Sequence, residues 1–387
     1  MAGTHPTLGG PRGRRPRDGC RVLLVGGGTG GHVSPLLAVA EALRETDPET
    51  ALLFIGGRRG LEADLVRAAE IPFHATAMPS LRDPDSRMSL VRRAFVIPLA
   101  AVDAWWQALR FHASVCCTTG GLVSLPAVLG ARAAGVPVYL WEGNVVPGRT
   151  NRLLARVAAR VGTTFDESKR SLPRGRTAVV GTPIRRSLLA WKRDSGRLAF
   201  AAGPDDAVVL VTGGSQGSER LNDAVFAALA RLLRRAVVIH VVGAANLAMA
   251  EARRANLPAE LRERYRPRGF LRDEMGAALA AADVFVGRAG SSSIAEPLAF
   301  GTPMVLVPFG AAADAHQLAN ARAVAEAGAA AVIQESELDG DRMTSIVTGL
   351  LDDRDRLRRM AAAARKAGRP DAARQVAAEL RALGGCG

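Results

Sequence analysis

Two glycine-rich turns in this 387-residue chain could bind an anion, and the first is followed by a side chain that could take up a proton. Residues 26–32 (GGGTGGH) come after the apolar run VLLVG at 22–26 and before a predicted helix. Glycines let backbone N–H groups approach an anion, and the N-terminus of a helix favours negative charge. His32 has an ordinary pKa of about 6.5, which suits a general base. The turn therefore predicts phosphate binding with His32 as candidate base; a histidine that only packs is the alternative.

The second glycine-rich turn, at 213–222 (GGSQGSERLN), also lies between an apolar run and a predicted helix. Ser215 and the helix N-terminus suit a phosphate. The spacing Gly213-x-Ser215-x-Gly217 matches a hydrolase nucleophile elbow as well. No oxyanion segment precedes it in the right order, so phosphate binding is favoured. The candidate partners of such a triad would be Asp283, Asp314 and His316.

Three serines stand between a predicted strand and a predicted helix at 287–297 (GRAGSSSIAEP). Ser291, Ser292 and Ser293 could cap the helix and offer N–H groups to an anion. Glu296 follows within the first turn, and its carboxylate could accept two hydrogen bonds from a ribose. An acidic residue that only favours the helix N-terminus is the alternative.

Two further motifs carry polar side chains. DAHQLANA (314–321) brings His316, Gln317 and Asn320 to a helix start, where neutral groups suit sugar hydroxyls; a solvated helix start is the alternative. Asp83-Pro84-Asp85 has the D-x-D form of metal–nucleotide sites but follows no apolar strand. We expect it to be a chance match, and we expect no metal ion and no cofactor.

The first glycine turn also satisfies G-x-G-x-x-G through Gly26, Gly28 and Gly31. Dehydrogenases that use NAD carry an acidic residue at the end of the second strand, where it binds the ribose. This chain has Gly56-Gly57-Arg58-Arg59 there. NAD is therefore not expected, and an NADP-dependent oxidoreductase is one alternative.

The elements that position these motifs alternate between strand and helix, twice over. Apolar runs predict strands at 22–26, 51–56, 114–121 and 136–143, and then again at 207–217, 237–243, 283–290 and 303–310. Such alternation predicts an α/β fold with two doubly wound parallel sheets, which bind ligands at the carboxyl ends of their strands. We expect a disordered basic tail at 1–20, domains at 21–185 and 207–370, and a linker at 186–206.

Composition narrows the function classes. The 51 basic and 37 acidic residues give a net charge of +14, which favours anionic partners. Aromatic residues make up only 4%, so platforms for base stacking are scarce and no nucleic acid is expected, although a nonspecific nucleic-acid binder is a third hypothesis from charge alone. The spacing of Cys20, Cys116, Cys117 and Cys386 suits neither a zinc site nor a disulfide framework, so a reducing cytosol is the simplest compartment.

The segment at 88–112 (MSLVRRAFVIPLAAVDAWWQALRFH) mixes large apolar residues with arginines. Trp105 and Trp106 stand near Arg110, and Arg92 and Arg93 lie at the other end. This pattern predicts an amphipathic patch that binds an anionic membrane surface. An ordinary buried helix is the alternative. No run of the chain is apolar for long enough to span a bilayer.

In their order and spacing, these motifs resemble the bacterial MurG family, which moves N-acetylglucosamine (GlcNAc) from UDP-GlcNAc to the muramyl-pentapeptide of undecaprenyl pyrophosphate, so that lipid I becomes lipid II. The resemblance runs from about residue 21 to 335. It is carried by GGTGGHVSPLLAVAEAL (27–43), GLEADLV (60–66), TGGLVSLPA (119–127), GVPVYLWEGNVVPGRTNRLLA (135–155), VVGTPIR (179–185), GGSQGSERLN (213–222), RAGSSSIAE (288–296), GTPMVLVPF (301–309) and HQLANA (316–321).

The resemblance implies a GT-B fold, with a last helix at about 371–385 that packs back on the N-terminal domain. It implies a metal-independent hexosyltransferase that inverts the sugar, serves cell-wall synthesis, cell shape and division, and works at the cytoplasmic face of the inner membrane as a peripheral protein. His32 would be the base, Arg185 and Ser215 would contact the pyrophosphate, Glu296 the ribose, and the backbone of Leu271 the uracil. Further donor contacts would come from Thr29, Gly30, Gly31, Asn144, Ser291, Ser292, Ser293, Ile294, Ala295 and Gln317, among which Asn144 and Gln317 would touch the sugar.

The chain departs from the family pattern at several positions, and the changed loop at 141–144 lies toward the acceptor. The family usually has His-Glu-Gln-Asn where this chain has Trp141-Glu142-Gly143-Asn144, and Leu122 replaces a common tyrosine. Three serines replace a small residue and a threonine, and Pro297 follows Glu296. A glycosyltransferase of the same fold that acts on another lipid or natural-product acceptor is therefore the alternative.

Overall fold

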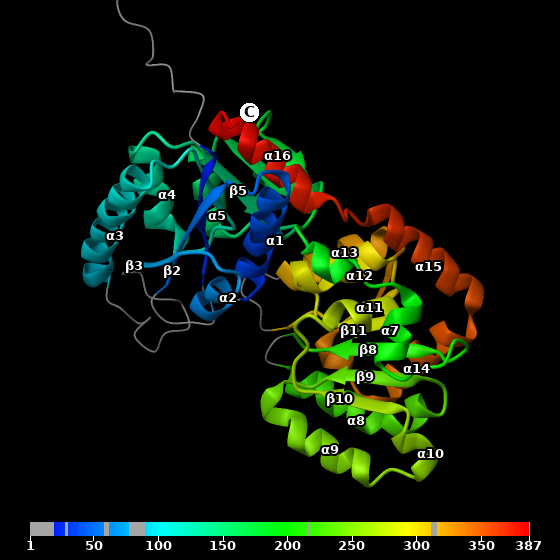
Figure 1. Cartoon of the computed structure of the whole chain (residues 1–387). Coiled ribbons are helices and arrows are strands. Elements are labelled where there is room, and N and C mark those ends of the chain that lie inside the picture. The colour runs from blue at the N-terminus through cyan, green and yellow to red at the C-terminus, as the bar shows by residue number, and fades with distance from the viewer. Residues whose placement is uncertain are drawn as a thin grey trace, which may run out of the picture.

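The chain folds into two α/β domains that stack one on the other, with the C-terminal helix back on the first (Figure 1). This computed structural model describes residues 19–27, 30–57, 62–76, 90–214, 217–310 and 316–386. Its elements alternate between strand and helix through both halves, as the apolar runs predict.

The N-terminal domain is built on a seven-stranded parallel sheet in the order β3-β2-β1-β4-β5-β6-β7. Its central strands β1, β4 and β5 are buried and mostly apolar because helices cover both faces of the sheet. Alternate residues of β1 enter opposite cores: Val22 and Leu24 face one, Leu23 and Val25 the other. The strands are β1 (Arg21–Val25), β2 (Ala51–Gly57), β3 (Phe73–Thr76), β4 (Val115–Thr118), β5 (Val138–Glu142), β6 (Arg160–Thr163) and β7 (Thr177–Val179).

The helices of this domain divide between the two faces of the sheet. α1 and α2 share one core with the C-terminal helix, whereas α3, α4 and α5 contribute to the other. The helices are α1 (Gly30–Thr46), α2 (Glu62–Ala68), α3 (Leu90–Arg110), α4 (Ser124–Ala133), α5 (Arg149–Val157) and the short 3₁₀ helix η2 (Glu167–Ser171). None of the helices described is long and apolar enough to cross a bilayer.

The C-terminal domain repeats this design on a six-stranded parallel sheet in the order β10-β9-β8-β11-β12-β13. The strands are β8 (Val208–Thr212), β9 (Val237–Val241), β10 (Tyr265–Arg268), β11 (Val284–Gly287), β12 (Met304–Leu306) and β13 (Ala330–Val332). The helices are α8 (Glu219–Leu233), η3 (Ala244–Asn246), α9 (Leu247–Ala255), α10 (Ala259–Arg262), α11 (Met275–Ala281), α12 (Ser291–Phe300), α13 (His316–Glu326), η5 (Glu335–Glu337), α14 (Gly340–Asp352) and α15 (Arg354–Ala367). α8 and α14 pack on one face of the sheet, and α11, α12 and α13 on the other.

Two short helices occupy the segment between the domains, α6 (Arg186–Leu189) and α7 (Arg193–Ala199). α7 packs on α11 and so belongs spatially to the C-terminal domain. Its Arg197 is 4% exposed and binds the carboxylate of Asp283 at 2.9 Å. The buried pair fixes this segment to the strand that follows α11.

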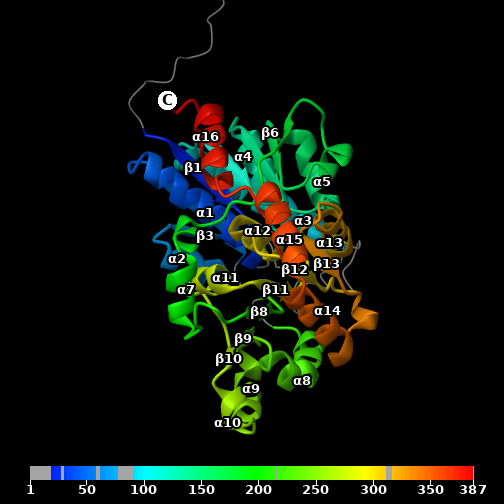
Figure 2. The same cartoon turned by 90° about the vertical axis from the view of Figure 1, so that its right-hand side faces the viewer.

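The last helix, α16 (Ala372–Gly384), returns to the N-terminal domain, as Figures 1 and 2 both show. It contacts α1 and β4, and its Val376 and Leu380 are fully buried in the core that α1 shares. Arg381 on α16 pairs with Asp47, directly after α1, at 3.0 Å. The N-terminal domain is therefore completed by the end of the chain.

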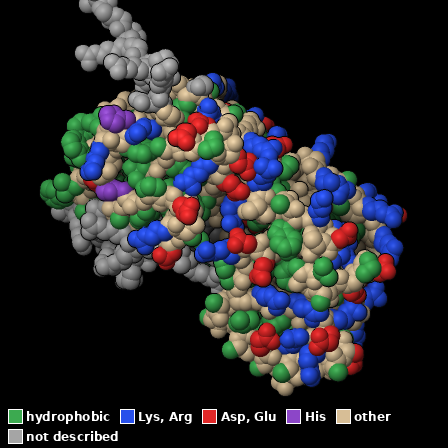
Figure 3. Space-filling model, viewed as in Figure 1, with side chains coloured by type: hydrophobic (Ala, Val, Ile, Leu, Met, Phe, Trp, Pro, Cys, Tyr) green, Lys and Arg blue, Asp and Glu red, His purple; other side chains and the backbone are tan. Residues whose placement is uncertain are grey.

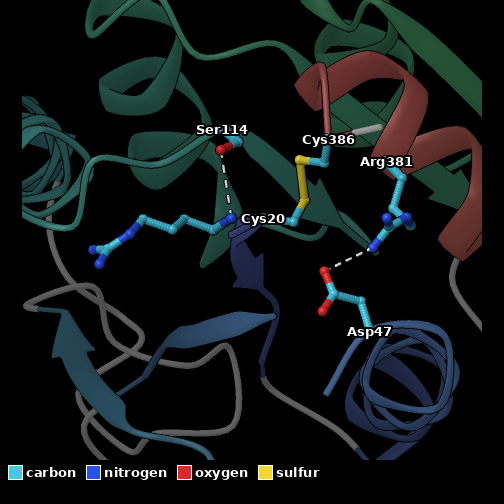
Figure 4. Close-up of a disulfide and its surroundings, with 6 residues drawn as sticks. Cys20, Asp47, Ser114, Arg381 and Cys386 are labelled. Carbon is cyan, nitrogen blue, oxygen red and sulfur yellow. Dashed lines mark hydrogen bonds and ion pairs between the residues drawn. A yellow bond between two sulfur atoms is a disulfide. The ribbon is translucent and has the colours of Figure 1, made fainter. Parts of the chain in front are cut away.

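A disulfide joins Cys20, just before β1, to Cys386, just after α16 (Figure 4). The expectation that the cysteines form no disulfide was therefore wrong. The cysteine spacing could not reveal the pair because 366 residues separate the two positions and only the folded chain brings them together. Cys116 and Cys117, on the buried β4, are free.

Candidate active site

The loops that carry the sequence motifs start side by side at the carboxyl edges of both sheets. In the N-terminal domain Val25 pairs with Thr118, so the first glycine turn and the loop after β4 begin at the same level. In the C-terminal domain Thr212 pairs with Gly287, which does the same for the second glycine turn and the serine turn. In each sheet this is where the strand order reverses, the position at which α/β sheets bind ligands.

His32 lies in the first turn of α1, close to the loop after β4. Thr119 Oγ1 donates to the carbonyl oxygen of His32 at 2.8 Å, which ties the helix start to that loop. Burial lowers the pKa of His32, while the nearby charge of Glu142 and the Thr119 contact oppose the shift. The imidazole is therefore neutral at pH 7, the state that a general base requires.

Glu142, at the end of β5, organises loops of the N-terminal domain at its boundary with the C-terminal domain, which we refer to as the cleft. It is 2% exposed. Oε1 accepts from the backbone N–H and the side-chain amide of Asn144, at 2.8 and 3.0 Å. Oε2 accepts from Asn151 Nδ2 at 2.8 Å and from Gly148 N at 3.3 Å. Sequence reasoning gave Glu142 no role, although an acidic residue at the end of an apolar strand was a usable signal.

Asn144 reaches the C-terminal domain across the cleft. Its Oδ1 accepts from Asn320 Nδ2 on α13 at 3.0 Å, and Asn320 Oδ1 accepts from Val145 N at 2.9 Å. The loop that precedes α5 and the start of α13 therefore touch directly. The expected sugar contact, Asn144, lies on the boundary between the two domains.

The start of α12 supplies a set of polar groups that a ligand could contact. Gly290 is the N-cap residue, and no side chain caps the helix, so the predicted capping role of the serines was wrong. Ser292 Oγ is buried, and no partner for it lies within the described part of the chain. The backbone N–H groups of a first helical turn have no partner inside the helix, so this turn can receive an oxyanion.

Glu296 lies one turn further along α12. Burial raises its pKa to about 7, and the positive charge of Arg185 opposes this shift. Arg185 also pairs with the exposed Asp273 at 3.3 Å. Because its partial burial disfavours the charged form, the carboxylate of Glu296 would be stabilised by hydrogen bonds that a ligand donates.

Gln317, in the first turn of α13, is oriented by two backbone groups. Its Oε1 accepts from Phe309 N at 3.0 Å and Ala289 N at 3.3 Å. Since the carbonyl end is used, the amide N–H₂ end is left to donate to a hydroxyl. Leu271, whose backbone is expected to contact the uracil, is 3% exposed and follows β10.

An ion pair that sequence reasoning missed supports the second glycine turn. Arg288 Nη2 contacts Glu335 Oε1 at 2.5 Å and donates to Ser218 Oγ at 2.6 Å. Ser218 is the N-cap residue of α8, where its Oγ accepts from Leu221 N. Arg288 is 7% exposed, so this pair fixes the start of α8 from inside the domain.

Not all of the predicted site residues lie in the described part of the chain. Thr29, Ser215 and the Asp83-Pro84-Asp85 motif lie outside the described residues. Gly31 is exposed at the start of α1, and Ile294 and Ala295 are buried in α12 within the core of the C-terminal domain. Among the residues that are described, no cluster of His, Cys, Asp and Glu is arranged to hold a metal ion.

A row of apolar side chains lies exposed along α3. They recur every three or four residues and so share one helix face: Phe95, Leu99, Val102, Trp106 and Leu109, exposed by 69, 68, 61, 57 and 40%. The space-filling view shows hydrophobic side chains along the edge of the upper domain where α3 lies (Figure 3). The opposite face is buried through Ala100, Ala104 and Ala108. We refer to the five exposed residues as the α3 face.

Comparisons with known proteins match both domains. Residues 22–163 match the N-terminal domain of glycosyltransferase family 28, and residues 208–376 match its C-terminal domain. The UDP-N-acetylglucosamine–N-acetylmuramyl-(pentapeptide) pyrophosphoryl-undecaprenol N-acetylglucosamine transferase of Moorella thermoacetica is 40% identical over 367 residues, which cover 91% of this chain and 96% of that protein. The enzyme of the same name from Desulfitobacterium hafniense is 37% identical, with 92% and 97% covered.

Solved structures give the same picture. MurG from Acinetobacter baumannii superposes with a TM-score of 0.75 at 28% identity, over 94% of this chain and 99% of that one. The calicheamicin glycosyltransferase CalG4 superposes with a TM-score of 0.64 at 19% identity, over 95% and 98%. The second likeness shows the shared fold alone.

Proposed function

Because this chain belongs to glycosyltransferase family 28, among the transferases that carry N-acetylglucosamine to lipid-linked muramyl-pentapeptide, we propose that it makes lipid II from UDP-GlcNAc and lipid I. The observation that carries the proposal is that polar residues of the two domains face each other at the cleft. We refer to the residues of each domain there as its half-site. Asn144, with Glu142 behind it, belongs to the N-terminal half, and Gln317 belongs to the C-terminal half. Asn320 joins the two halves by direct hydrogen bonds.

The C-terminal half-site suits the donor. The carboxylate of Glu296 accepts hydrogen bonds from the ribose, while Gln317 donates to hydroxyls of the sugar. The backbone of Leu271 meets the uracil. Arg185, Ser215 and the first turn of α12 (Ser291, Ser292 and Ser293) receive the pyrophosphate, since N–H groups at a helix start and a guanidinium both favour a phosphate.

The N-terminal half-site suits the chemical step. The 4-hydroxyl oxygen of the muramyl sugar attacks C1 of GlcNAc, the C1–O bond to UDP breaks, and the α-linked donor gives a β-1,4 product. The neutral imidazole of His32 accepts the proton that the hydroxyl loses. The charge that develops on UDP is stabilised by helix N–H groups and by Arg185, which do the work that a divalent cation does elsewhere.

The α3 face suits the membrane in which lipid I is anchored. Five exposed apolar side chains on one helix face form a surface that can enter the boundary between headgroups and acyl chains. Arg110, at the end of the same helix, is exposed. The net charge of +14 adds attraction to anionic lipid. We therefore propose that the protein binds the cytoplasmic face of the bacterial inner membrane peripherally.

Transfer of radiolabelled GlcNAc to a short-chain lipid I analogue tests this function. Label in the lipid product and release of UDP are expected with the wild-type chain. If UDP-GlcNAc is consumed only when another lipid or a soluble acceptor is present, the protein is instead a glycosyltransferase of the same fold with a different acceptor. The Trp141-Glu142-Gly143-Asn144 loop, which departs from the family pattern toward the acceptor, is the feature that favours this second candidate.

A further inference from the structure

The side chain of Asn320 is completely buried although it lies between the two domains. Its amide makes three hydrogen bonds. Oδ1 accepts from Val145 N at 2.9 Å, and Nδ2 donates to Asn144 Oδ1 at 3.0 Å and to Ala289 O at 3.1 Å. Two of these bonds join α13 to the loop after β5, and the third joins it to the serine turn. One side chain therefore connects three segments at the cleft.

These bonds also fix the direction of the Asn144 amide. Asn144 Oδ1 must face a donor, and Asn320 Nδ2 is that donor. Asn144 Nδ2 must face an acceptor, and Glu142 Oε1 is that acceptor at 3.0 Å. A primary amide has two N–H bonds. One hydrogen of Asn144 therefore remains for a hydroxyl group while the other holds the amide in place.

The connection continues beyond Asn144 and Asn320 in both directions. On the N-terminal side, Glu142 binds Asn151, whose Oδ1 accepts from Gly121 N at 2.9 Å. On the C-terminal side, Ala289 bonds to Asn320 through its carbonyl oxygen and to Gln317 through its N–H. The loops expected to meet the acceptor and the loops expected to meet the donor are thus linked by one chain of hydrogen bonds.

We propose that Asn320 is a positioning residue that latches the two domains together and presents Asn144 to the donor sugar. This inference rests on the proposed function, since it takes UDP-GlcNAc as the ligand. Both N–H bonds of the Asn320 amide are donated to protein oxygens. Asn320 therefore acts by orienting Asn144 and by fixing the distance between the domains, and it does not touch the reacting atoms. The latch should matter for UDP-GlcNAc, which spans both half-sites, and not for UDP, whose proposed contacts need no Asn144.

Asn320→Asp tests the latch with almost no change in size. The aspartate can still accept from Val145 N through one oxygen, but its second oxygen, which replaces Nδ2, cannot donate and so faces two acceptor oxygens, Asn144 Oδ1 and Ala289 O. Calorimetry should show that the affinity for UDP-GlcNAc falls at least about tenfold, the scale for one buried polar group without a partner. The affinity for UDP should stay within about twofold. Small-angle scattering should show a larger radius of gyration than for the wild-type chain.

Asn222→Asp is the matched control. Asn222 is 1% exposed in the same domain, and among the described residues its amide bonds to Val242 O and His240 of that domain. This variant should lose thermal stability while it keeps the wild-type ratio of UDP-GlcNAc to UDP affinity and the wild-type radius.

The outcomes separate the latch from the proposed function. If Asn320→Asp weakens UDP and UDP-GlcNAc equally, or leaves both affinities and the radius unchanged, the latch is overturned. If the wild-type chain transfers no GlcNAc to lipid I, the proposed function fails, yet the comparison of affinities still decides the latch. Should UDP-GlcNAc not bind at all, an expanded Asn320→Asp chain beside a wild-type-sized Asn222→Asp chain supports the latch, and equal sizes overturn it.

Discussion

Gly143 lies so close to Ser291 that no side chain fits between them. An ideal Cβ at Gly143 would stand 2.7 Å from Ser291 Oγ and 2.9 Å from Ser291 Cβ, and 2.6 Å from Trp141 Cη2. Gly143 belongs to the loop after β5 and Ser291 to the start of α12, so the contact joins the two domains. The large side chain of Trp141 thus fits in this loop because residue 143 has no side chain.

Gly143→Gln should therefore force the cleft open. Overpacking of this kind costs about 1–3 kcal/mol, and separation of the domains is the way to relieve it. We expect the affinity for UDP-GlcNAc to fall roughly tenfold, as measured by calorimetry. Gly148→Gln is the control, because no atom of the described residues lies within 4 Å of a Cβ at Gly148, which belongs to the same loop. Equal affinities for the two variants would contradict the close approach.

Glu296→Gln should stabilise the protein and weaken donor binding. Burial raises the pKa of this carboxyl to about 7 from 4.5. A raised pKa means that the contribution to stability is present below about pH 4.5 and lost as the pH rises through about 7. The variant should thus melt above the wild-type chain at pH 8, and this gain should shrink at pH 5. At pH 8 it should bind UDP-GlcNAc more weakly by roughly 2–3 kcal/mol. The exposed Glu337→Gln should change neither quantity, and donor affinity unaltered in Glu296→Gln would remove the ribose role.

His32→Gln should reduce kcat by roughly 10²–10⁴-fold and leave KM for UDP-GlcNAc almost unchanged, because a base acts in the transition state. Burial lowers the pKa of His32 below its ordinary value of 6.5, so activity should be lost only on the acid side of that pH. Glu142→Gln removes a charge that raises this pKa, and should move the acid limb of the pH–rate profile further down. A raised KM with an intact kcat would make His32 a binding residue.

Phe95→Ser combined with Trp106→Ser should weaken binding to anionic vesicles at least tenfold, since each apolar side chain that enters lipid contributes about 1.5–3 kcal/mol. Leu198→Ser is the control, because Leu198 is 82% exposed on α7 of the other domain. Co-sedimentation at low and high salt measures the effect. A chain that starts at Gly19 should be run in parallel, since the Arg-rich residues before it could bind lipid themselves. If the double variant still binds the vesicles as the wild-type chain does, the α3 face does not bind the membrane.

Reduction of the disulfide should lower the free energy of unfolding by about 2–5 kcal/mol. Denaturant unfolding with and without dithiothreitol measures this, and Cys386→Ser should be unstable to the same extent under both conditions. Burial raises the pKa of Cys116 to about 12, so this thiol stays protonated and unreactive in the folded chain. Four titratable thiols in the denatured, unreduced protein would contradict the pair.

The sequence was most informative where apolar runs end in glycine. The strands β1, β2, β4, β5, β8, β9, β11 and β12 coincide with predicted runs. The sequence did not predict the other five strands, which are only three or four residues long and several of which contain polar residues: β3, β6, β7, β10 and β13. Their pairing depends on neighbouring strands that the local sequence does not reveal. The strand order needed the folded chain in the same way.

The site could be predicted only motif by motif. Glu296 and Gln317 were proposed for their chemistry, and both lie with the expected loops at one edge. Asn320 was seen only as one polar residue of a helix start, because its importance comes from Asn144, which is 176 positions away. Cys20 and Cys386 illustrate the same limit: residue spacing indicates local contacts, whereas these roles arise from long-range packing.

The return of α16 makes the C-terminal domain an insertion into the N-terminal one. Gly181 lies near the expected end of the first domain at residue 185, and Ala372 begins the helix that returns to it. A Cβ at Gly181 would lie 2.6 Å from Arg369 Cβ and 3.3 Å from Ala372 Cβ, so the two crossings run side by side. A domain attached by two adjacent chain segments can rotate about them, but they restrict its translation along the other domain. We therefore expect the two domains to open by rotation about these crossings, while the two ends of the chain, joined by the disulfide, stay with the N-terminal domain.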